Sequence, residues 1–286
     1  MFRILRKLIL FLLLIVTLLA LYVYQSTVIP LQDTLVVKDS KVNDSLQCVT
    51  HKPADSLDNH GSLDIAIWNI HKQKNSGWQN VVTKLASRSD LLLLQEANLN
   101  QQFLDKLDEL QEDWVLAKAF VFAGDPIGVM NLAHQYPLST CAFRYKEPII
   151  YYPKSLLVSY YQLSDSSQLL VINIHSINFT VGLEEYRNQL SVVTEAIKSH
   201  TGPVILAGDL NTWSEQRSQY VATILTDFGL VEAIPKVDSR SQFLGQTLDH
   251  IFYRDLQFIK AESIVTDSSD HNPLKAYFRL VKPSLK

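Results

Sequence analysis

Polar side chains that can bind a metal or move a proton stand at the ends of short apolar runs along this chain. Such runs are typical of buried strands, and in α/β proteins functional sites assemble at strand ends. Five runs carry such a residue, and a further pair lies in the segment SDHNP near the C-terminus. We expect these side chains to meet in one site: Asn69, Glu96, His175, Asp209 with Asn211, Asp249, and Asp270 with His271.

The mixture of residue types favours hydrolysis of a phosphate ester. A hard cation such as Mg²⁺ or Mn²⁺ takes oxygen ligands from carboxylates and amides. We therefore expect Glu96 and Asp270, with Asn69, to hold the metal. The attacking water must be oriented and deprotonated, which is the role that we assign to Asp209.

The remaining residues suit the charge that develops during the reaction. Asn69, Asn211 and a protonated histidine can stabilise the negative phosphoryl oxygens. His175 is the candidate proton donor to the leaving group. Asp249 can orient His271, as acidic residues commonly do for catalytic imidazoles.

Taken singly, several of these residues have a plainer explanation. The Asp209 segment GDLN is a common turn, Asn69 could cap a helix, and His175 could be a hydrogen-bonded core histidine. Their joint occurrence is what favours an enzyme. For the histidines outside the pattern we expect structural or surface roles: His71, His134 and His250.

Strand-like and helical segments alternate along the chain. Hydrophobic residues make up 47% and charged residues 19% of the sequence, a composition that supports a sizeable core. Strands alternating with helices indicate an α/β fold with layered sheets. We expect strands at 63–69, 90–96, 169–175, 203–209 and 248–253, and helices at 78–88, 101–111, 184–200 and 215–228.

The N-terminus carries a candidate membrane anchor. After Arg3, Arg6 and Lys7, residues 8–24 are uncharged and long enough to span a bilayer as a helix. Because small residues suited to a cleavage site are scarce, we expect a retained anchor, with a buried core helix as the alternative. The positive charges predict that residues 1–7 stay in the cytoplasm and that the rest is periplasmic or extracytoplasmic. Residues 25–61 are interpreted as a stalk or linker with a short strand at 33–38, and residues 62–286 as the catalytic domain.

Net charge and cysteine content narrow the function. The formal net charge is −3, and removing Arg3, Arg6 and Lys7 leaves −6 (−3 minus 3), so tight non-specific DNA binding is not favoured. Cys48 and Cys141 have no partner at metal-ligand spacing, which argues against zinc. We expect two unpaired thiols, with a disulfide as the alternative in an oxidising compartment.

Six segments, in this order, resemble the motif series of the deoxyribonuclease I-like endonuclease/exonuclease/phosphatase superfamily: IAIWNIHK, LLLLQEAN, VINIHS, GDLNTW, TLDHIFY and SDHNP. The resemblance covers about residues 63–280. The segments GVM, YPL and EPIIYYPKSLLV bring it closest to small bacterial YafD-like members. It implies a four-layered, two-sheet α/β sandwich, here preceded by one transmembrane helix.

The resemblance also implies a role for each matched residue. Asn69 and Glu96 match the family's metal-site residues, His175 matches its acid, and Asp209 with Asn211 matches the pair that orients the nucleophile. Asp249 matches the aspartate that pairs with the final histidine, and Asp270 with His271 matches the terminal SDH motif.

Two positions depart from the family's pattern. Lys154 stands where several members place a phosphate-binding arginine, and a lysine keeps the charge but loses the bidentate geometry. Phe120 and Phe122 occupy the region where some nucleases carry a tyrosine and glutamate pair. The second departure argues against a specific deoxyribonuclease.

The predicted activity is metal-dependent hydrolysis of a phosphodiester or phosphomonoester by an activated water, on a nuclease-like or small phosphoester substrate. One alternative is a phospholipid or sphingolipid phosphodiesterase at the membrane surface, since tethering raises the local concentration of lipid. A second is a non-catalytic, membrane-tethered binding module. The expected partners are the phosphate-ester substrate (nucleic acid or a lipid headgroup) and the membrane, and no protein partner is inferred.

Overall fold

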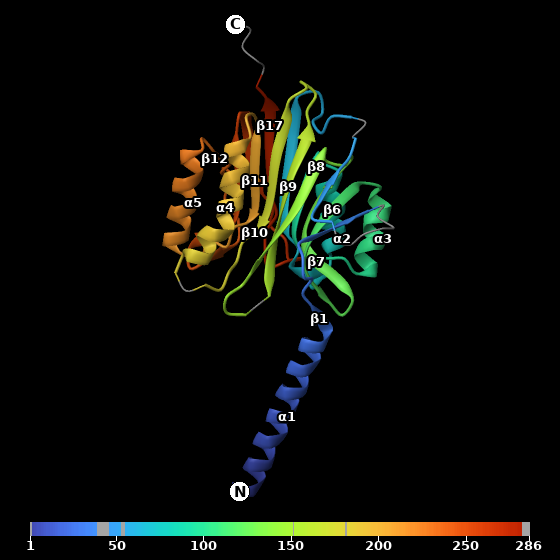
Figure 1. Ribbon diagram of the computed structural model, residues 1–286, viewed down its shortest axis with the longest axis vertical. Coiled ribbons are helices and arrows are strands. Elements are labelled where there is room, and N and C mark those ends of the chain that lie inside the picture. The colour runs from blue at the N-terminus through green and yellow to red at the C-terminus, as the bar shows by residue number, and fades with distance from the viewer. Residues whose placement is uncertain (1, 39–45, 53–54, 151, 181, 282–286) are drawn as a thin grey trace.

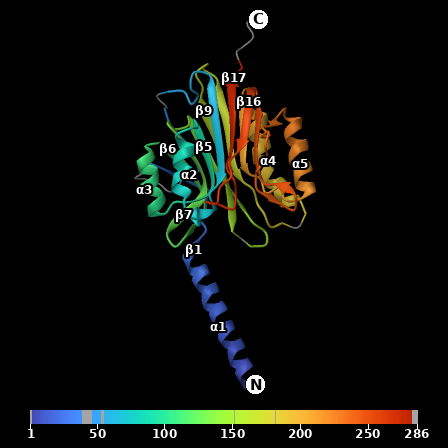
Figure 2. The same cartoon turned by 180° about the vertical axis from the view of Figure 1, so that it is seen from behind.

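Two β-sheets stack face to face, with helices on both outer faces and one long helix projecting from the domain (Figure 1). The computed structural model describes residues 2–38, 46–52, 55–150, 152–180 and 182–281. The predicted four-layered α/β sandwich with an N-terminal apolar helix is confirmed. Seen from behind, the same helix leaves the domain at the edge where β1 lies (Figure 2).

The first sheet has the strand order β1-β6-β7-β5-β4-β17-β16, with β2 also paired to β6. Within it, β4 and β5 are parallel and the other pairs are antiparallel. The bounds are β1 Thr27–Val28, β2 Thr34–Val37, β4 Ser62–Asn69, β5 Leu91–Asn98, β6 Asp113–Phe122, β7 Asp125–Ala133, β16 Leu256–Ser263 and β17 Leu274–Leu280.

The second sheet has the strand order β12-β15-β11-β10-β9-β8-β3, and here β10 and β11 form the parallel pair. A hairpin of β13 (Gln242–Phe243) and β14 (Gln246–Thr247) lies apart from both sheets. The bounds are β3 Cys48–Thr50, β8 Ser139–Lys146, β9 Pro153–Gln162, β10 Gln168–His175, β11 Val204–Asp209, β12 Val231–Glu232 and β15 Asp249–Arg254.

Each sheet is covered by its own pair of helices. The helices α2 (Trp78–Ala86) and α3 (Gln101–Leu110) bury Trp78 and Phe103 against the first sheet. The helices α4 (Glu184–Ser199) and α5 (Glu215–Asp227) cover the second sheet. All four helices fall where the sequence predicts them, within two residues at each end.

Alternation along the central strands separates two sets of core residues. In β4, Ile65 and Ile67 pack between the sheets, whereas Ala66 and Trp68 pack under the helices. The same split holds in β11, where Ile205 faces the other sheet. Since successive side chains of a strand point to opposite faces, residue parity decides which strand-end residues enter the space between the sheets.

The chain between the long helix and the domain joins both sheets. The helix α1 (Phe2–Ser26) contains one candidate membrane span, Arg3–Ser26, none of whose side chains is buried in the domain. It runs directly into β1, which pairs with β6. The strand expected at 33–38 is confirmed as β2, and β3 pairs with β8 in the second sheet.

The expectation of two unpaired thiols is wrong, because Cys48 and Cys141 form a disulfide. They are directly opposite residues of the β3–β8 pair, with Cα atoms 4.1 Å apart. The sequence gives no sign that residues 48–50 form a strand in register with β8, so the proximity of the two cysteines could not be predicted.

Candidate functional site

A cavity of about 530 Å³ opens at the edge of the sandwich where β4, β5, β10 and β11 end. Asp249 lies behind its wall, and every other residue predicted for the site lines it. The site residues in the lining are Asn69, Glu96, Lys154, His175, Asp209, Asn211, Asp270 and His271. Side chains spread over some two hundred positions are therefore brought together as expected.

Parity explains how most of these residues reach the cavity. Ile67, Val171 and Ile205 face the opposite sheet, so the odd-numbered residues at the ends of their strands point the same way. Those residues are Asn69, His175 and Asp209, and Asp249 follows the same rule in β15, where Ile251 faces inward.

Glu96 has the wrong parity and reaches the cavity through a β-bulge. In β5, Leu91 and Leu93 face the other sheet, while Leu92 and Leu94 face the helices. Between Leu94 and Ala97 the pairing with β7 shifts register by one residue, and Glu96 adopts a left-handed φ of 54°. A bulge inserts one extra residue and redirects its side chain, and this turns the Glu96 carboxylate into the cavity.

The Asp209 carboxylate is the centre of the hydrogen-bond network. Its Oδ2 accepts from Asn69 Nδ2 at 3.0 Å, and its Oδ1 accepts from the backbone N–H of Asn211 at 3.0 Å. The same Oδ2 lies 3.4 Å from His175 Nε2 and 3.9 Å from His271 Nε2. Asp209 is thus placed between two imidazoles, with both of its oxygens oriented.

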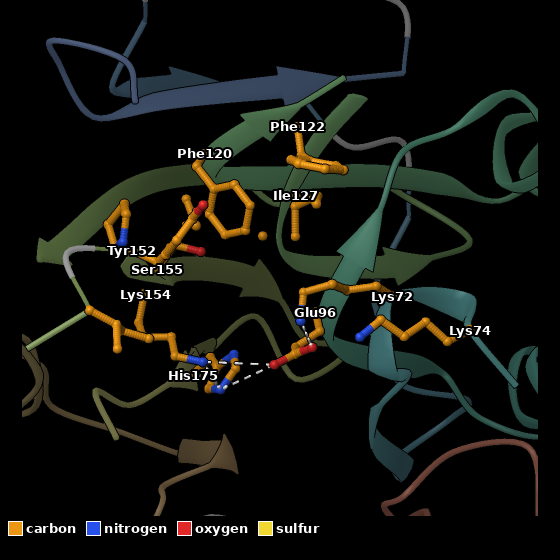
Figure 3. A pocket seen from close by; sticks show the side chains of 14 residues that line it. Lys72, Lys74, Glu96, Phe120, Phe122, Ile127, Tyr152, Lys154, Ser155 and His175 are labelled. Carbon is orange, nitrogen blue, oxygen red and sulfur yellow. Dashed lines mark hydrogen bonds and ion pairs between the residues drawn. The ribbon is translucent and has the colours of Figure 1, made fainter. Parts of the chain in front are cut away.

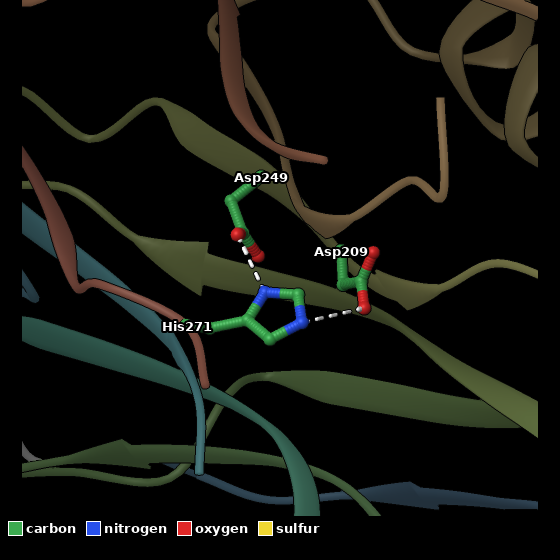
Figure 4. Close-up of side chains that lie close together, drawn as sticks. All are labelled: Asp209, Asp249 and His271. Atoms are coloured by element: carbon green, nitrogen blue, oxygen red, sulfur yellow. Dashed lines mark hydrogen bonds and ion pairs between the residues drawn. The ribbon is translucent and has the colours of Figure 1, made fainter. Parts of the chain in front are cut away.

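Asp249 fixes the orientation of the His271 ring and favours its protonated form. Nδ1 of His271 donates to Asp249 Oδ2 at 2.7 Å, and Nε2 points toward Asp209 (Figure 4). Burial alone would lower the pKa of His271, but the charge and hydrogen bond of Asp249, with Asp209, outweigh it and raise the pKa to about 10. His271 is therefore an imidazolium at neutral pH.

A second group of charges surrounds Glu96. Lys72 Nζ donates to Oε2, while Lys154 Nζ lies 3.7 Å and His175 Nε2 3.9 Å from Oε1. Burial would raise the pKa of Glu96, but these neighbours hold it well below its ordinary range. The Glu96 carboxylate is therefore ionised.

His175 differs from His271 in charge. Its Nε2 accepts from Lys154 Nζ at 2.8 Å. Burial and the positive charge of Lys154 outweigh the nearby carboxylates and lower the pKa of His175 to about 3. The two imidazoles beside Asp209 thus differ at neutral pH, since His175 is neutral and His271 is charged.

The donors around Glu96 fit a hard divalent cation. The carboxylates of Glu96 and Asp270 and the Oδ1 atom of Asn69 offer oxygen, as Mg²⁺ or Mn²⁺ prefers. Positive charge already gathers at the Glu96 carboxylate, in the ammonium groups of Lys72 and Lys154.

A different grouping, Asp209, Asp249 and His271, has its ligand atoms within 4.8 Å of one another. In this grouping the ligand atoms are already engaged, since His271 Nδ1 donates to Asp249 Oδ2 and both Asp209 oxygens accept hydrogen bonds. We therefore favour the Glu96 and Asp270 side of the cavity for the ion.

Some contributing residues escape prediction from the sequence. Lys72 follows β4 in a short 3₁₀ turn (His71–Gln73), and Arg217 donates from α5 to the carbonyls of Ile177, Asn178 and Asn211 in the loops that follow β10 and β11. Lys72 lies within the motif segment IAIWNIHK, and this position is the one feature of the sequence that could have indicated a role for it in the site. Arg217 gives none, because a helical arginine is usually exposed.

The remaining histidines have mixed roles. His250 is buried and its Nδ1 lies 2.6 Å from Glu232 Oε1, which confirms a structural role. His71 Nδ1 lies 3.6 Å from Asp270 Oδ1. Its Nδ1 also lies 3.1 Å from Asn75 Oδ1, and His71 is not among the residues that line the cavity, so its structural or surface role stays a prediction.

The chain is similar in sequence to several known proteins. Residues 66–271 match the sequence profile of the endonuclease/exonuclease/phosphatase family. A UPF0294 protein of Vibrio cholerae is 42% identical over 255 residues, which cover 88% of this chain and 91% of that protein. A UPF0294 protein of Yersinia pestis is 41% identical over 217 residues, with coverage of 76% and 84%.

Two solved structures share the fold at low identity. An endonuclease/exonuclease/phosphatase protein from Bacteroides vulgatus superposes with a TM-score of 0.61 at 17% identity, covering 77% of this chain and 99% of its own. A mannosyl-6-phosphatase from Bacteroides thetaiotaomicron gives a TM-score of 0.58 at 16% identity, covering 75% and 98%.

The charge of His271 makes a prediction about stability and pH. Because its pKa is raised from 6.5 to about 10 on folding, the folded state holds the extra proton between those values. The stabilisation is complete below pH 6.5 and is lost as the pH rises through 10. Between pH 7 and pH 10, the melting temperature should fall more for the wild type than for His271→Gln. His60→Gln, at an exposed histidine, should follow the wild type, and parallel curves for His271→Gln would contradict the assignment.

Proposed function

Because this chain belongs to the endonuclease/exonuclease/phosphatase family, we propose that it is a divalent-metal-dependent phosphoesterase that attacks phosphorus with an activated water. One observation carries the proposal. Oδ2 of Asp209 lies within 4 Å of Nε2 of both His175 and His271, in the cavity that Glu96 and Asp270 also line. A carboxylate between a neutral and a charged imidazole can take a proton from water while positive charge faces the phosphate.

The attacking water is the part of the mechanism assigned to Asp209. Asn69 and the backbone N–H of Asn211 hold its two oxygens, so that the carboxylate orientation is fixed before substrate arrives. Asn211 itself has a left-handed φ of 48° and donates from Nδ2 to the Ser176 carbonyl. This bond joins the loops after β10 and β11 and keeps His175 and Asp209 adjacent.

His271 and His175 have the two remaining roles, which are to stabilise charge and to help protonate the leaving group. The His271 imidazolium, held by Asp249, stabilises the negative phosphoryl oxygens. The proton for the leaving group is assigned to the Lys154–His175 pair, joined at 2.8 Å, since His175 alone is neutral. Mg²⁺ or Mn²⁺, held by Glu96 and Asp270 with Asn69, would offset the charge of the phosphoryl oxygens when bound.

A hydrolysis assay tests the proposal. We expect the full chain in detergent to hydrolyse bis(p-nitrophenyl) phosphate with Mg²⁺ or Mn²⁺ and to stop on addition of EDTA. Asp209→Ala should lower the rate by about 10²–10⁴-fold, because the general base is lost. Asp105→Ala, on the exposed face of α3, is the matched control and should keep the rate. Substrate binding without turnover in the wild type would instead favour a non-catalytic binding module.

We also propose that the domain lies outside the cytoplasm. Two observations support this orientation: Arg3, Arg6 and Lys7 precede the candidate span, and Cys48 and Cys141 form a disulfide, a bond typical of oxidising compartments.

Thiol alkylation during lysis of intact cells tests the orientation. The full chain should show no reactive thiol until it is denatured and reduced, and then two. Two thiols that react on denaturation without a reductant would place the domain in a reducing compartment.

A further inference from the structure

A second cavity adjoins the catalytic one, and its lining changes from charged to apolar. It measures about 440 Å³ and shares Glu96, Lys154 and His175 with the first cavity. Lys72 and Lys74 also line it, and away from these charges the lining is hydrocarbon and aromatic: Ala119, Phe120, Phe122, Ile127, Ile150 and Tyr152. In Figure 3 the aromatic side chains lie on one side of the space and the Lys154, His175 and Glu96 group on the other.

The apolar part offers few polar partners to a ligand. The Tyr152 hydroxyl lies 3.3 Å from Thr27 Oγ1, and the Phe120 ring packs edge-on against Tyr152 at 5.2 Å. Ser155 Oγ is occupied by the Ala117 carbonyl and the Val129 amide. A nucleobase can stack on these rings, but its edges are read through hydrogen bonds, for which this surface offers few partners, so it suits a hydrocarbon chain better than a base.

The rim of this cavity is attached to the candidate membrane helix. Thr27 and Val28 pair with Phe122 and Val121, and the Ser26 carbonyl accepts from Ala123 N at 2.8 Å. In both views α1 leaves the domain at this edge (Figures 1 and 2). Tyr22 and Tyr24 lie near the end of α1, and tyrosines prefer the membrane–water interface. The mouth of the cavity is therefore next to the surface of the bilayer that α1 would span.

We propose that the substrate is a membrane phospholipid whose phosphodiester lies at Glu96, Lys154 and His175 and whose hydrocarbon occupies the apolar cavity. The inference rests on the phosphoesterase function proposed above. It uses the anchor, the apolar lining and the charged junction together. A soluble phosphoester would need only the charged junction.

The position of the proton donor selects the bond that breaks. Asp209 lines only the catalytic cavity, whereas Lys154 and His175 line both cavities, so we assign as the leaving oxygen the one that carries the diacylglycerol. Water adds to phosphorus and the bond from phosphorus to this oxygen breaks. The proton passes from Lys154–His175 to the leaving oxygen, while Asp209 takes one from water. The products are diacylglycerol and the phosphorylated headgroup, and no other reactant is needed.

Inhibition by alkyl phosphates tests the cavity without a membrane substrate. We expect dodecyl phosphate, below its micelle concentration, to inhibit hydrolysis of bis(p-nitrophenyl) phosphate by the full chain at least about 100-fold better than ethyl phosphate, because every methylene buried in the apolar cavity strengthens binding. Ile150→Glu should reduce that advantage by about tenfold or more, whereas Ile259→Glu should keep both the advantage and the uninhibited rate. Ile150 is 42% exposed, and Ile259→Glu, at a 48% exposed site on β16, is the matched control.

A second assay uses vesicles of phosphatidylglycerol and phosphatidylcholine with the full chain reconstituted. Release of diacylglycerol, lost in Ile150→Glu and in Phe122→Ser but not in Ile259→Glu, supports the proposal. Turnover of bis(p-nitrophenyl) phosphate without any action on the vesicles overturns the lipid inference alone. Inhibition by adenosine monophosphate that equals dodecyl phosphate and is equally sensitive to Ile150→Glu also overturns it, in favour of a nucleotide. No turnover of any phosphoester overturns the proposed function itself.

Discussion

The site depends on a single irregularity in the alternation of β-strand side chains. Parity sends Asn69, His175, Asp209 and Asp249 into the space between the sheets, but it would send Glu96 toward the helices. The bulge between Leu94 and Ala97 reverses this, at the cost of a left-handed glutamate. Such a conformation costs on the order of 1–3 kcal/mol and persists only where the surrounding structure enforces it. Here the contacts of Lys72, Lys154 and His175 with the carboxylate hold Glu96 in this conformation.

Charge balance explains why the groups hold one another in place. Burying a charge costs free energy unless the charge is paired and hydrogen-bonded. The site contains two sets of such pairs. Asp249 charges His271, and Lys72 and Lys154 neutralise Glu96. Asp209 lies between the two sets, and hydrogen bonds from Asn69 and Asn211 fix the orientation of its carboxylate. Removing one member leaves a partner unpaired, so single substitutions should disturb more than one step of the reaction.

The sequence predicts the parts of this structure that follow from local pattern. Apolar runs with a polar last residue locate the strands β4, β5, β10 and β11, and amphipathic spacing locates all four domain helices. The long-range features escape it. The pairing of β3 with β8, and with it the Cys48–Cys141 disulfide, depends on register between distant segments. The bulge at Glu96 and the hydrogen bonds from the buried Arg217 to the loops after β10 and β11 also depend on tertiary contacts, which a local sequence pattern does not predict.

We propose that Glu96, turned inward by the bulge, holds a divalent ion beside Asp209. Electron paramagnetic resonance of Mn²⁺ titrated into the full chain measures this directly, since bound and free Mn²⁺ give different signals. The wild type should bind one Mn²⁺, and Glu96→Gln should lose that binding while Glu195→Gln, on the exposed face of α4, retains it. Unchanged Mn²⁺ binding in Glu96→Gln would contradict the account.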